Sequence, residues 1–198
     1  MLAKITHWRV LFVILVFASA SACETNVVRT LIPDLSFSHL PTFKFAVAEI
    51  IIKDYRADAK EEANIEARFP IPISDALKQW TEDRLIAAGG TNIMLVVIEE
   101  ARVSSELLEI DKDLEALFTV EQAERITAVL RVKIQIVDKE GKVVAFTRAE
   151  CTRSRTIGEN ISLNERDGIY NEITTVLMND FNTSQEQEIH KYFKSYTK

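Results

Sequence analysis

The chain of 198 residues is poor in the residue types that build reactive centres, with two cysteines and three histidines. It contains no CxxC or HExxH motif and no cluster of histidine with aspartate, so we expect no zinc site. It has no GxSxG motif, and Gly89-Gly90 follows a helical pattern instead of opening one. A phosphate-binding loop needs glycines before a helix. The sequence therefore predicts no catalytic residues, no metal and no cofactor.

Glycine and proline are also scarce, with five and four residues, which excludes collagen-like and low-complexity segments. No apolar run approaches the roughly 20 residues that a helix needs to span a bilayer. Basic side chains are fewer than acidic ones, 24 against 30, so the net charge is −6. Nucleic acid and bare anionic lipid both attract a positive surface. The sequence predicts neither as a partner.

The first 22 residues have the three parts of a bacterial export signal. Two basic residues precede an apolar run over residues 10–18, and residues 20–23 read Ala-Ser-Ala-Cys. The run has the length of a signal-peptide core. The last four residues resemble a lipobox, whose cysteine is acylated and becomes the first residue after cleavage. That resemblance implies a signal peptide over 1–22 and a membrane anchor formed by acyl chains on Cys23.

Two other interpretations of this segment stay open, a plain secretion signal with an incidental cysteine and an anchor that is not cleaved. Cleavage before Cys23 would remove two of 24 basic residues, and 22 basic against 30 acidic side chains leaves a net charge of −8. The residue after Cys23 is Glu24, whereas Asp at this position is associated with inner-membrane retention in enteric bacteria. We therefore expect a periplasmic protein at the outer membrane. With Cys23 acylated, Cys151 has no disulfide partner.

The rest of the chain predicts a lipidated tether over 23–42 and a single domain over 43–198. Alternating apolar residues predict four strands, over 43–53, 91–103, 125–137 and 142–156. Helical periodicity, a capping box at Ser162–Glu165 and polar residues at 182–184 predict three helices, over 73–88, 162–181 and 184–196. The first helix should stop at Gly89-Gly90.

The element order β-α-β-β-β-α predicts an α+β fold, a four-stranded, mostly antiparallel sheet with helices on one face and a further C-terminal helix. The first half of the strand over 91–103 is apolar on both sides. This indicates a central strand that is covered on both faces, or one whose second face meets a partner. Cys151 lies on the small-residue side of the last strand, which predicts a buried, inert thiol.

Arg84 is a candidate contact for an anion or a partner, because it lies on the apolar stripe of the first helix. An unpaired charge would be costly to bury there. Arg84 either faces a cavity as a ligand-binding group or pairs with an acid from the sheet. The candidate acids are Glu99, Glu100 and Glu150.

Arg148 is the second candidate contact. It forms a sequence cluster with Arg153 and Arg155 on or after the last strand. The cluster could bind an anion, and the simpler interpretation is pairing with cross-strand carboxylates.

Some stretches resemble uncharacterised lipoproteins of alphaproteobacteria, namely Asn64–Pro72, Trp80, Arg84-Leu85, Gly89 and Gln122–Arg125. The element order is similar to that of LptE-type envelope lipoproteins and of the auxiliary lipoproteins of ABC transporters. The resemblances imply a non-enzymatic assembly or transport accessory with an envelope protein as partner. The alternatives are a lipoprotein that binds a small molecule or lipid between helix and sheet near Arg84, and an envelope hydrolase.

Overall fold

The computed structural model describes residues 34–55, 64–108, 123–158 and 160–198, so Cys23 and the signal segment lie outside the described residues. The elements in chain order are β1 (Phe43–Asp54), η2 (Glu66–Arg68), α2 (Ile73–Arg84), β2 (Leu85–Leu108), β3 (Ala123–Val137), β4 (Val143–Gly158), α3 (Leu163–Tyr192) and η3 (Lys194–Tyr196). None of the described helices is long and apolar enough to cross a membrane.

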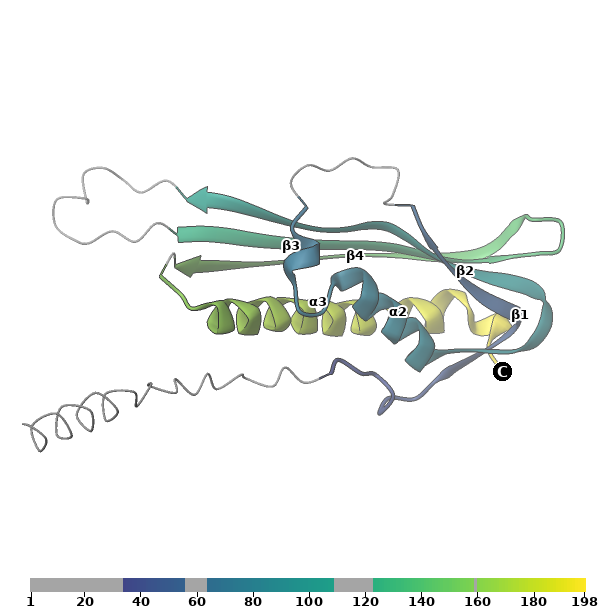
Figure 1. Ribbon diagram of the computed structural model, residues 1–198. Helices are drawn as coiled ribbons and strands as arrows, with labels where there is room; N and C mark the ends of the chain where they lie inside the picture. Colours follow the sequence, from purple (N-terminus) through teal and green to yellow (C-terminus); the bar gives the residue numbers. More distant parts are fainter. Residues whose placement is uncertain (1–33, 56–63, 109–122, 159) are drawn as a thin grey trace, which may run out of the picture. The chain divides into compact units, whose positions relative to one another are not determined.

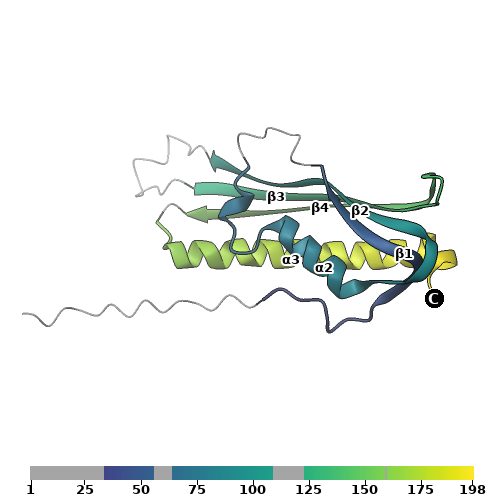
Figure 2. The ribbon, with the colours of Figure 1, turned by 45° about the vertical axis from the view of Figure 1, so that its right-hand side comes forward.

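The four strands form one sheet in the order β1-β2-β3-β4. β1 runs parallel to β2, and the β2-β3 and β3-β4 pairs are antiparallel. Figures 1 and 2 show α2 and α3 beneath the same face of the sheet. The predicted α+β fold with a mostly antiparallel, four-stranded sheet is confirmed. We call the face turned away from both helices the open face, because no helix among the described residues covers it.

Part-way along β1, the alternation of side chains between the two faces of the sheet shifts by one residue. Phe45 and Val47 are fully buried on the helix side. An irregular register between Val47 and Glu49 then shifts the alternation, and Ile50 and Ile52 pack against the same core. Simple alternation places Val47 and Ile50 on opposite faces, and this interpretation is wrong because of the bulge.

α2 ends at Arg84, four residues before the predicted stop at 88, and β2 begins directly afterwards. The extended Leu85 closes the helix without a glycine, since its N–H bonds to the Thr81 carbonyl. Gly90 instead lies where β2 passes close to β1. A Cβ atom on Gly90 would collide with the Ala46 carbonyl, so this approach requires glycine.

α3 is one helix of 30 residues, although the sequence predicts a break at 182–184. Asn182 accepts a hydrogen bond from Trp80 Nε1 on α2 at 2.9 Å. Thr183 Oγ1 donates to the carbonyl one turn earlier. These polar side chains find partners without interrupting the backbone, and the helix therefore continues.

The core lies between the sheet and the two helices. Trp80 is fully buried, and its ring meets Phe181 edge to face at 4.9 Å between centroids. The inward side chains of β3, from Ile126 to Ile136, are all fully buried. Thr147 on β4 donates to Gln185 on α3 at 3.1 Å. α3 thus covers the small-residue side of β4.

The residues before β1 also pack on the domain. Phe37 is only 2% exposed and belongs to the core. Its N–H donates to Asp83 Oδ2 on α2 at 2.6 Å, and Ser36 Oγ donates to the same oxygen at 3.0 Å. The described part of the lead-in is therefore held at the surface of α2.

Candidate functional site

The open face presents its side chains in rows that cross the strands, because directly paired residues share a face. The basic row consists of Lys53, Val97, Lys133 and Arg148, one residue from each strand. On the side of the β3-β4 hairpin follows the apolar row of Ile51, Leu95, Gln135 and Phe146. On the other side of the basic row lies the paired row of Glu100, Arg131 and Glu150.

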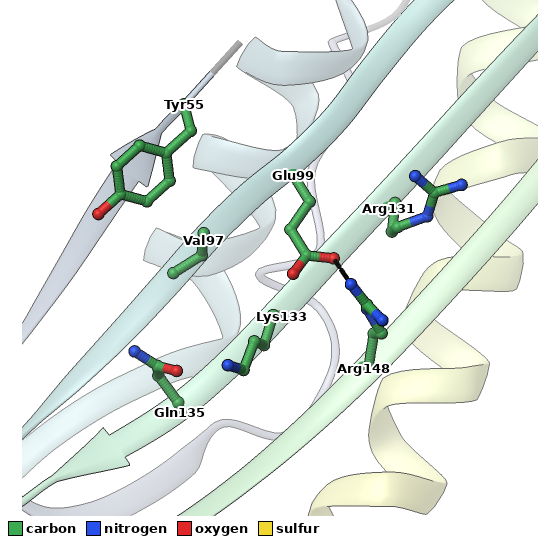
Figure 3. A pocket seen from close by; sticks show the side chains of 7 residues that line it. All are labelled: Tyr55, Val97, Glu99, Arg131, Lys133, Gln135 and Arg148. Atoms are coloured by element: carbon green, nitrogen blue, oxygen red, sulfur yellow. Dashed lines mark hydrogen bonds and ion pairs between the residues drawn. The ribbon is translucent and has the colours of Figure 1, made fainter. Parts of the chain in front are cut away.

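A hollow of about 440 Å³ lies over the basic row. Its lining residues, drawn in Figure 3, are Tyr55, Val97, Glu99, Arg131, Lys133, Gln135 and Arg148. Tyr55 directly follows β1 and is 54% exposed. Phe146, the register partner of Gln135, is 57% exposed. The site therefore combines three cations with exposed aromatic side chains.

Arg148 is held by a carboxylate on the same face. Its Nε and Nη2 donate to Glu99 Oε2 at 2.8 and 2.6 Å, the contact marked in Figure 3. Arg148 therefore pairs with an acid, as the simpler interpretation predicts. The acid lies on β2, two strands away, and not on the directly neighbouring strand.

Arg131 is the centre of the paired row. It binds Glu150 Oε2 at 2.9 Å and Glu100 Oε2 at 2.8 Å. The hydrogen bond to Glu150 raises the pKa of Arg131, and the same bond lowers the pKa of Glu150. Its positive charge is therefore fully engaged within the sheet.

Lys133 is the remaining cation of the hollow, and no described carboxylate lies within salt-bridge distance of it. It stands directly opposite Arg148 in the β3-β4 register. Its Nζ lies 5.5 Å from the centroid of the Phe146 ring. Like charges on directly opposite positions destabilise a sheet. Lys133 and Arg148 are such a pair, and Lys133 has no described carboxylate partner. The stability of the fold does not explain this arrangement.

Arg84, the other candidate from the sequence, lies in a different part of the molecule. Its side chain is fully buried and donates to Glu186 Oε2 on α3 at 3.1 Å and to the Pro41 carbonyl. The guanidinium also lies over the Phe43 ring at 4.9 Å. Burial lowers the pKa of Arg84, and the Glu186 carboxylate opposes this effect.

The expected sheet partners of Arg84 are wrong, although an acid does lie within reach. Glu99, Glu100 and Glu150 bind the arginines of the open face, whereas Arg84 faces α3 and the lead-in. Pro41, Phe43 and Glu186 occupy the space around its guanidinium. Arg84 thus links α2 to α3 and to the lead-in.

The arginine cluster expected from the sequence is divided between the two faces of the sheet. Arg153 pairs with Asp180 and Arg155 with Glu172, both on α3. Arg148 points the opposite way, into the hollow. Cys151 faces α3 and is partly buried, and burial raises the pKa of its thiol.

Within the described ranges, no group of three or more His, Cys, Asp and Glu side chains is arranged to hold a metal. His190 packs edge to face on Phe43 at 5.5 Å, and His39 is exposed before β1. Neither contacts the hollow. Of the predicted contact residues, the structure thus brings only Arg148 to this site.

Sequence reasoning missed Lys53, Tyr55, Lys133 and Phe146 as members of one site. Lys133 and Gln135 do alternate with buried residues of β3, which marks one side of that strand as polar. The alternation does not say which residues of β1 and β4 lie beside them. That information is in the register, and the bulges of β1 and β2 alter it.

No family model and no curated protein matches the chain. Solved structures show a distant likeness to the chain, among them three bacterial proteins. A minor lipoprotein from Acinetobacter baumannii is 11% identical over 73% of this chain and 92% of its own, with a TM-score of 0.37. Rare lipoprotein B from Shewanella oneidensis is 10% identical over 72% and 97%, with a TM-score of 0.38.

The third structure is a neuraminyllactose-binding hemagglutinin homolog from Helicobacter pylori. It is 8% identical over 69% of this chain and 81% of its own, with a TM-score of 0.37. The first two neighbours are bacterial lipoproteins. Likenesses at this distance transfer no function, so a functional assignment depends on the residues of this chain.

Proposed function

We propose that the protein is a lipid-anchored lipoprotein of the bacterial envelope and a non-enzymatic accessory in assembly or transport. Acyl chains on Cys23 hold it in the membrane, the outer membrane in our proposal, and the domain faces the periplasm. There it binds an envelope protein on its open face. The lipobox-like residues 20–23 and the resemblance to alphaproteobacterial and LptE-type lipoproteins support the anchor.

The observation that carries the proposed binding role is the open face. A sheet face that meets only water is normally polar. Here the apolar row, with Ile93 and Val137 beside it, interrupts the polar surface. Phe146 and Tyr55 are both more than half exposed. Exposed aromatic side chains beside charged ones are typical of protein-protein interfaces.

The alternative, a ligand site between helix and sheet near Arg84, has less support. The guanidinium there already has two acceptors and a ring contact. Trp80 and Phe181 fill the neighbouring core. A ligand at this position would have to displace buried, hydrogen-bonded side chains, which is costly.

The anchor is tested by metabolic labelling with a clickable palmitate. We expect label on the wild-type chain and none on Cys23→Ser, which should stay unprocessed or be cut elsewhere. Membrane fractionation of the labelled protein then separates outer from inner membrane. An unlabelled wild-type protein would contradict the lipoprotein assignment.

The open face is tested by a photo-crosslinking residue at Phe146 in living cells. We expect a defined protein adduct from this position. The matched control is Tyr192, an aromatic residue on α3 that is 48% exposed and also lies beside a lysine. Adducts of equal yield from both positions, or none from Phe146, would contradict a specific partner on this face.

A further inference from the structure

We infer that the partner segment on the open face is an amphipathic helix that carries a line of carboxylates. The helix lies across the strands, with its acidic side on the basic row and its apolar side on the apolar row. This inference rests on the proposed function and specifies the chemistry of the partner. Lys133 is its central contact.

The first argument is the charge of the basic row. Lys53, Lys133 and Arg148 are set across the full width of the sheet. One carboxylate, Glu99, serves this row and is bound by Arg148. In the described part of the chain, neither lysine forms an ion pair. The row therefore keeps two positive charges that carboxylates from outside can neutralise.

The second argument is that the excess charge is local. In the adjacent paired row, Arg131 already binds two carboxylates. The whole chain is acidic, with a net charge of −6. A broad anionic lipid surface would also meet Glu49, Glu100 and Glu150 on this face, and repulsion would oppose binding. A discrete acidic segment laid along the basic row avoids them.

The third argument is spacing. Neighbouring strands are about 4.8 Å apart. Lys133 and Arg148 are on neighbouring strands and are therefore separated by about this distance. Lys53 and Lys133 are two strands apart, which is about 10 Å. On a helix, positions i and i+4 are separated by about 6 Å and positions i and i+7 by about 10.5 Å along the axis. Carboxylates seven positions apart match Lys53 and Lys133, the two cations without an ion pair in the described part of the chain, if the helix runs across the strands.

The fourth argument is the neighbourhood of the basic row. The apolar row lies two residues further along each strand, about 7 Å away. A helix whose acidic line faces the basic row therefore places its apolar flank on Leu95 and Phe146. Tyr55 also lines the hollow (Figure 3), and its exposed ring carries a hydroxyl that can bind a partner.

The test uses the full-length, lipidated chain in cells, with the photo-crosslinker at Phe146. Lys133→Glu should reduce the adduct at least about tenfold, the effect of losing roughly 1.4 kcal/mol of binding free energy. Lys133→Gln should reduce it several-fold, and Lys133→Arg should retain it. The matched control is Lys139→Glu in the β3-β4 hairpin, where the lysine is 75% exposed and outside the rows. Thermal melting confirms that each variant is folded.

Sequencing of the crosslinked peptide completes the test. We expect an amphipathic helix with Asp or Glu at helical spacing, and replacing one of these acids by Lys should restore the adduct with Lys133→Glu. An adduct that survives Lys133→Glu, or a peptide without acids, overturns the inference while leaving the proposed partner on this face intact. No adduct from Phe146 overturns the proposed function itself. Binding of the purified chain to phosphatidylglycerol vesicles that requires Lys133, without a protein adduct, identifies a lipid surface instead.

Discussion

Arg84 shows how one buried charge is accommodated in this fold. Its guanidinium is fully buried, whereas the Glu186 side chain is 42% exposed. Removing the arginine therefore leaves Glu186 free to be hydrated. The main uncompensated group is the Pro41 carbonyl, which loses its donor. The energetic cost should depend on whether the replacement still fills the volume over Phe43.

This reasoning predicts different outcomes for two substitutions of Arg84. Arg84→Met keeps the apolar stem over Phe43 and should lower the free energy of unfolding by about 1–2 kcal/mol. Arg84→Ala also leaves a cavity and should cost about 2–5 kcal/mol. Urea denaturation measures both. Equal losses for the two variants would mean that charge, and not packing, dominates at this position.

Lys133 should behave in the opposite way, as a residue that folding does not need. Lys133→Gln removes a like charge opposite Arg148 and also the contact with the Phe146 ring. Both effects are of the order of 0.5 kcal/mol and they oppose each other. We expect the free energy of unfolding to change by less than about 0.5 kcal/mol in urea titrations. A loss above about 1.5 kcal/mol would assign Lys133 a structural role.

At the scale of single residues, the sequence could predict that Arg84 needs a partner but not that Glu186 supplies it. Glu186 is 102 positions away on a different helix, and no periodicity links the two. For Arg148, the sequence did indicate an ion pair, because the chain has a surplus of carboxylates. Lys133 was visible only as a polar residue on β3, because its neighbours are set by strand register.

Among the elements, the β1-β2 pair depends on one glycine. Gly90 lies against the Ala46 backbone, where a Cβ atom has no room. Gly90→Ala should therefore lower the free energy of unfolding by about 1–3 kcal/mol through overpacking alone. Gly141 in the hairpin is the matched control, since its φ is +82° but a Cβ there meets no atom within 4 Å. Gly141→Ala should cost only the backbone strain, about 1 kcal/mol.

Thermal or urea denaturation of the two glycine variants provides the comparison. A larger loss for Gly141→Ala than for Gly90→Ala would contradict the close approach of β2 to β1. Gly89-Gly90 was predicted to stop a helix, because a glycine pair after an apolar helical pattern usually ends the helix. The close approach could not be inferred, since it depends on the parallel pairing with β1.

α2 is fixed to α3 and the sheet by Trp80. Trp80→Ala should lower the free energy of unfolding by about 3–5 kcal/mol, since the ring is fully buried against Phe181. Trp80→Phe keeps much of the volume but leaves the Asn182 oxygen without its donor, at a cost of about 1–3 kcal/mol. Urea denaturation measures the difference. A loss below about 1 kcal/mol for Trp80→Ala would contradict its role as an anchor.

The elements themselves were largely predictable because their signals are local. Strict alternation marks β3, and a capping box at Ser162 and Glu165 marks the start of α3. The bulge in β1 and the unbroken passage of α3 through residues 182–184 were not predictable. Both depend on contacts between distant segments, such as that of Asn182 with Trp80.

For the whole molecule, the docked lead-in would limit how far the domain of the proposed lipoprotein can stand from an anchor at Cys23. With Phe37 and the residues around it held on α2, only residues 23–33 precede the described part of the domain. Eleven fully extended residues reach at most about 40 Å, and the 20 residues of 23–42 about 70 Å. In the proposed lipoprotein, docking of the lead-in thus shortens the maximum reach from the anchor by about 30 Å.

Asp83 contributes to this attachment through hydrogen bonds that depend on its charge. Burial alone would raise the pKa of Asp83, but hydrogen bonds from the Phe37 N–H, Gln79, Ser36 and the Ser38 N–H outweigh burial and lower it. A carboxyl group whose pKa is lower in the folded state stabilises that state fully above its unfolded pKa, about 3.9 for Asp. This contribution is lost as the pH falls through the lowered, folded-state value.

We therefore predict that protonation of Asp83 in acid weakens the attachment of the lead-in to α2. The NMR resonance of the Phe37 amide, which donates to Asp83 at 2.6 Å, should titrate at a pH below the usual range of Asp. Asp83→Asn should abolish this titration, weaken the attachment by about 1 kcal/mol and speed proteolysis around Phe37 at neutral pH. Asp75→Asn on the exposed side of α2 is the control. A Phe37 amide that does not respond to acid, or a lead-in as resistant in Asp83→Asn as in wild type, would show that Phe37 packing alone holds the segment.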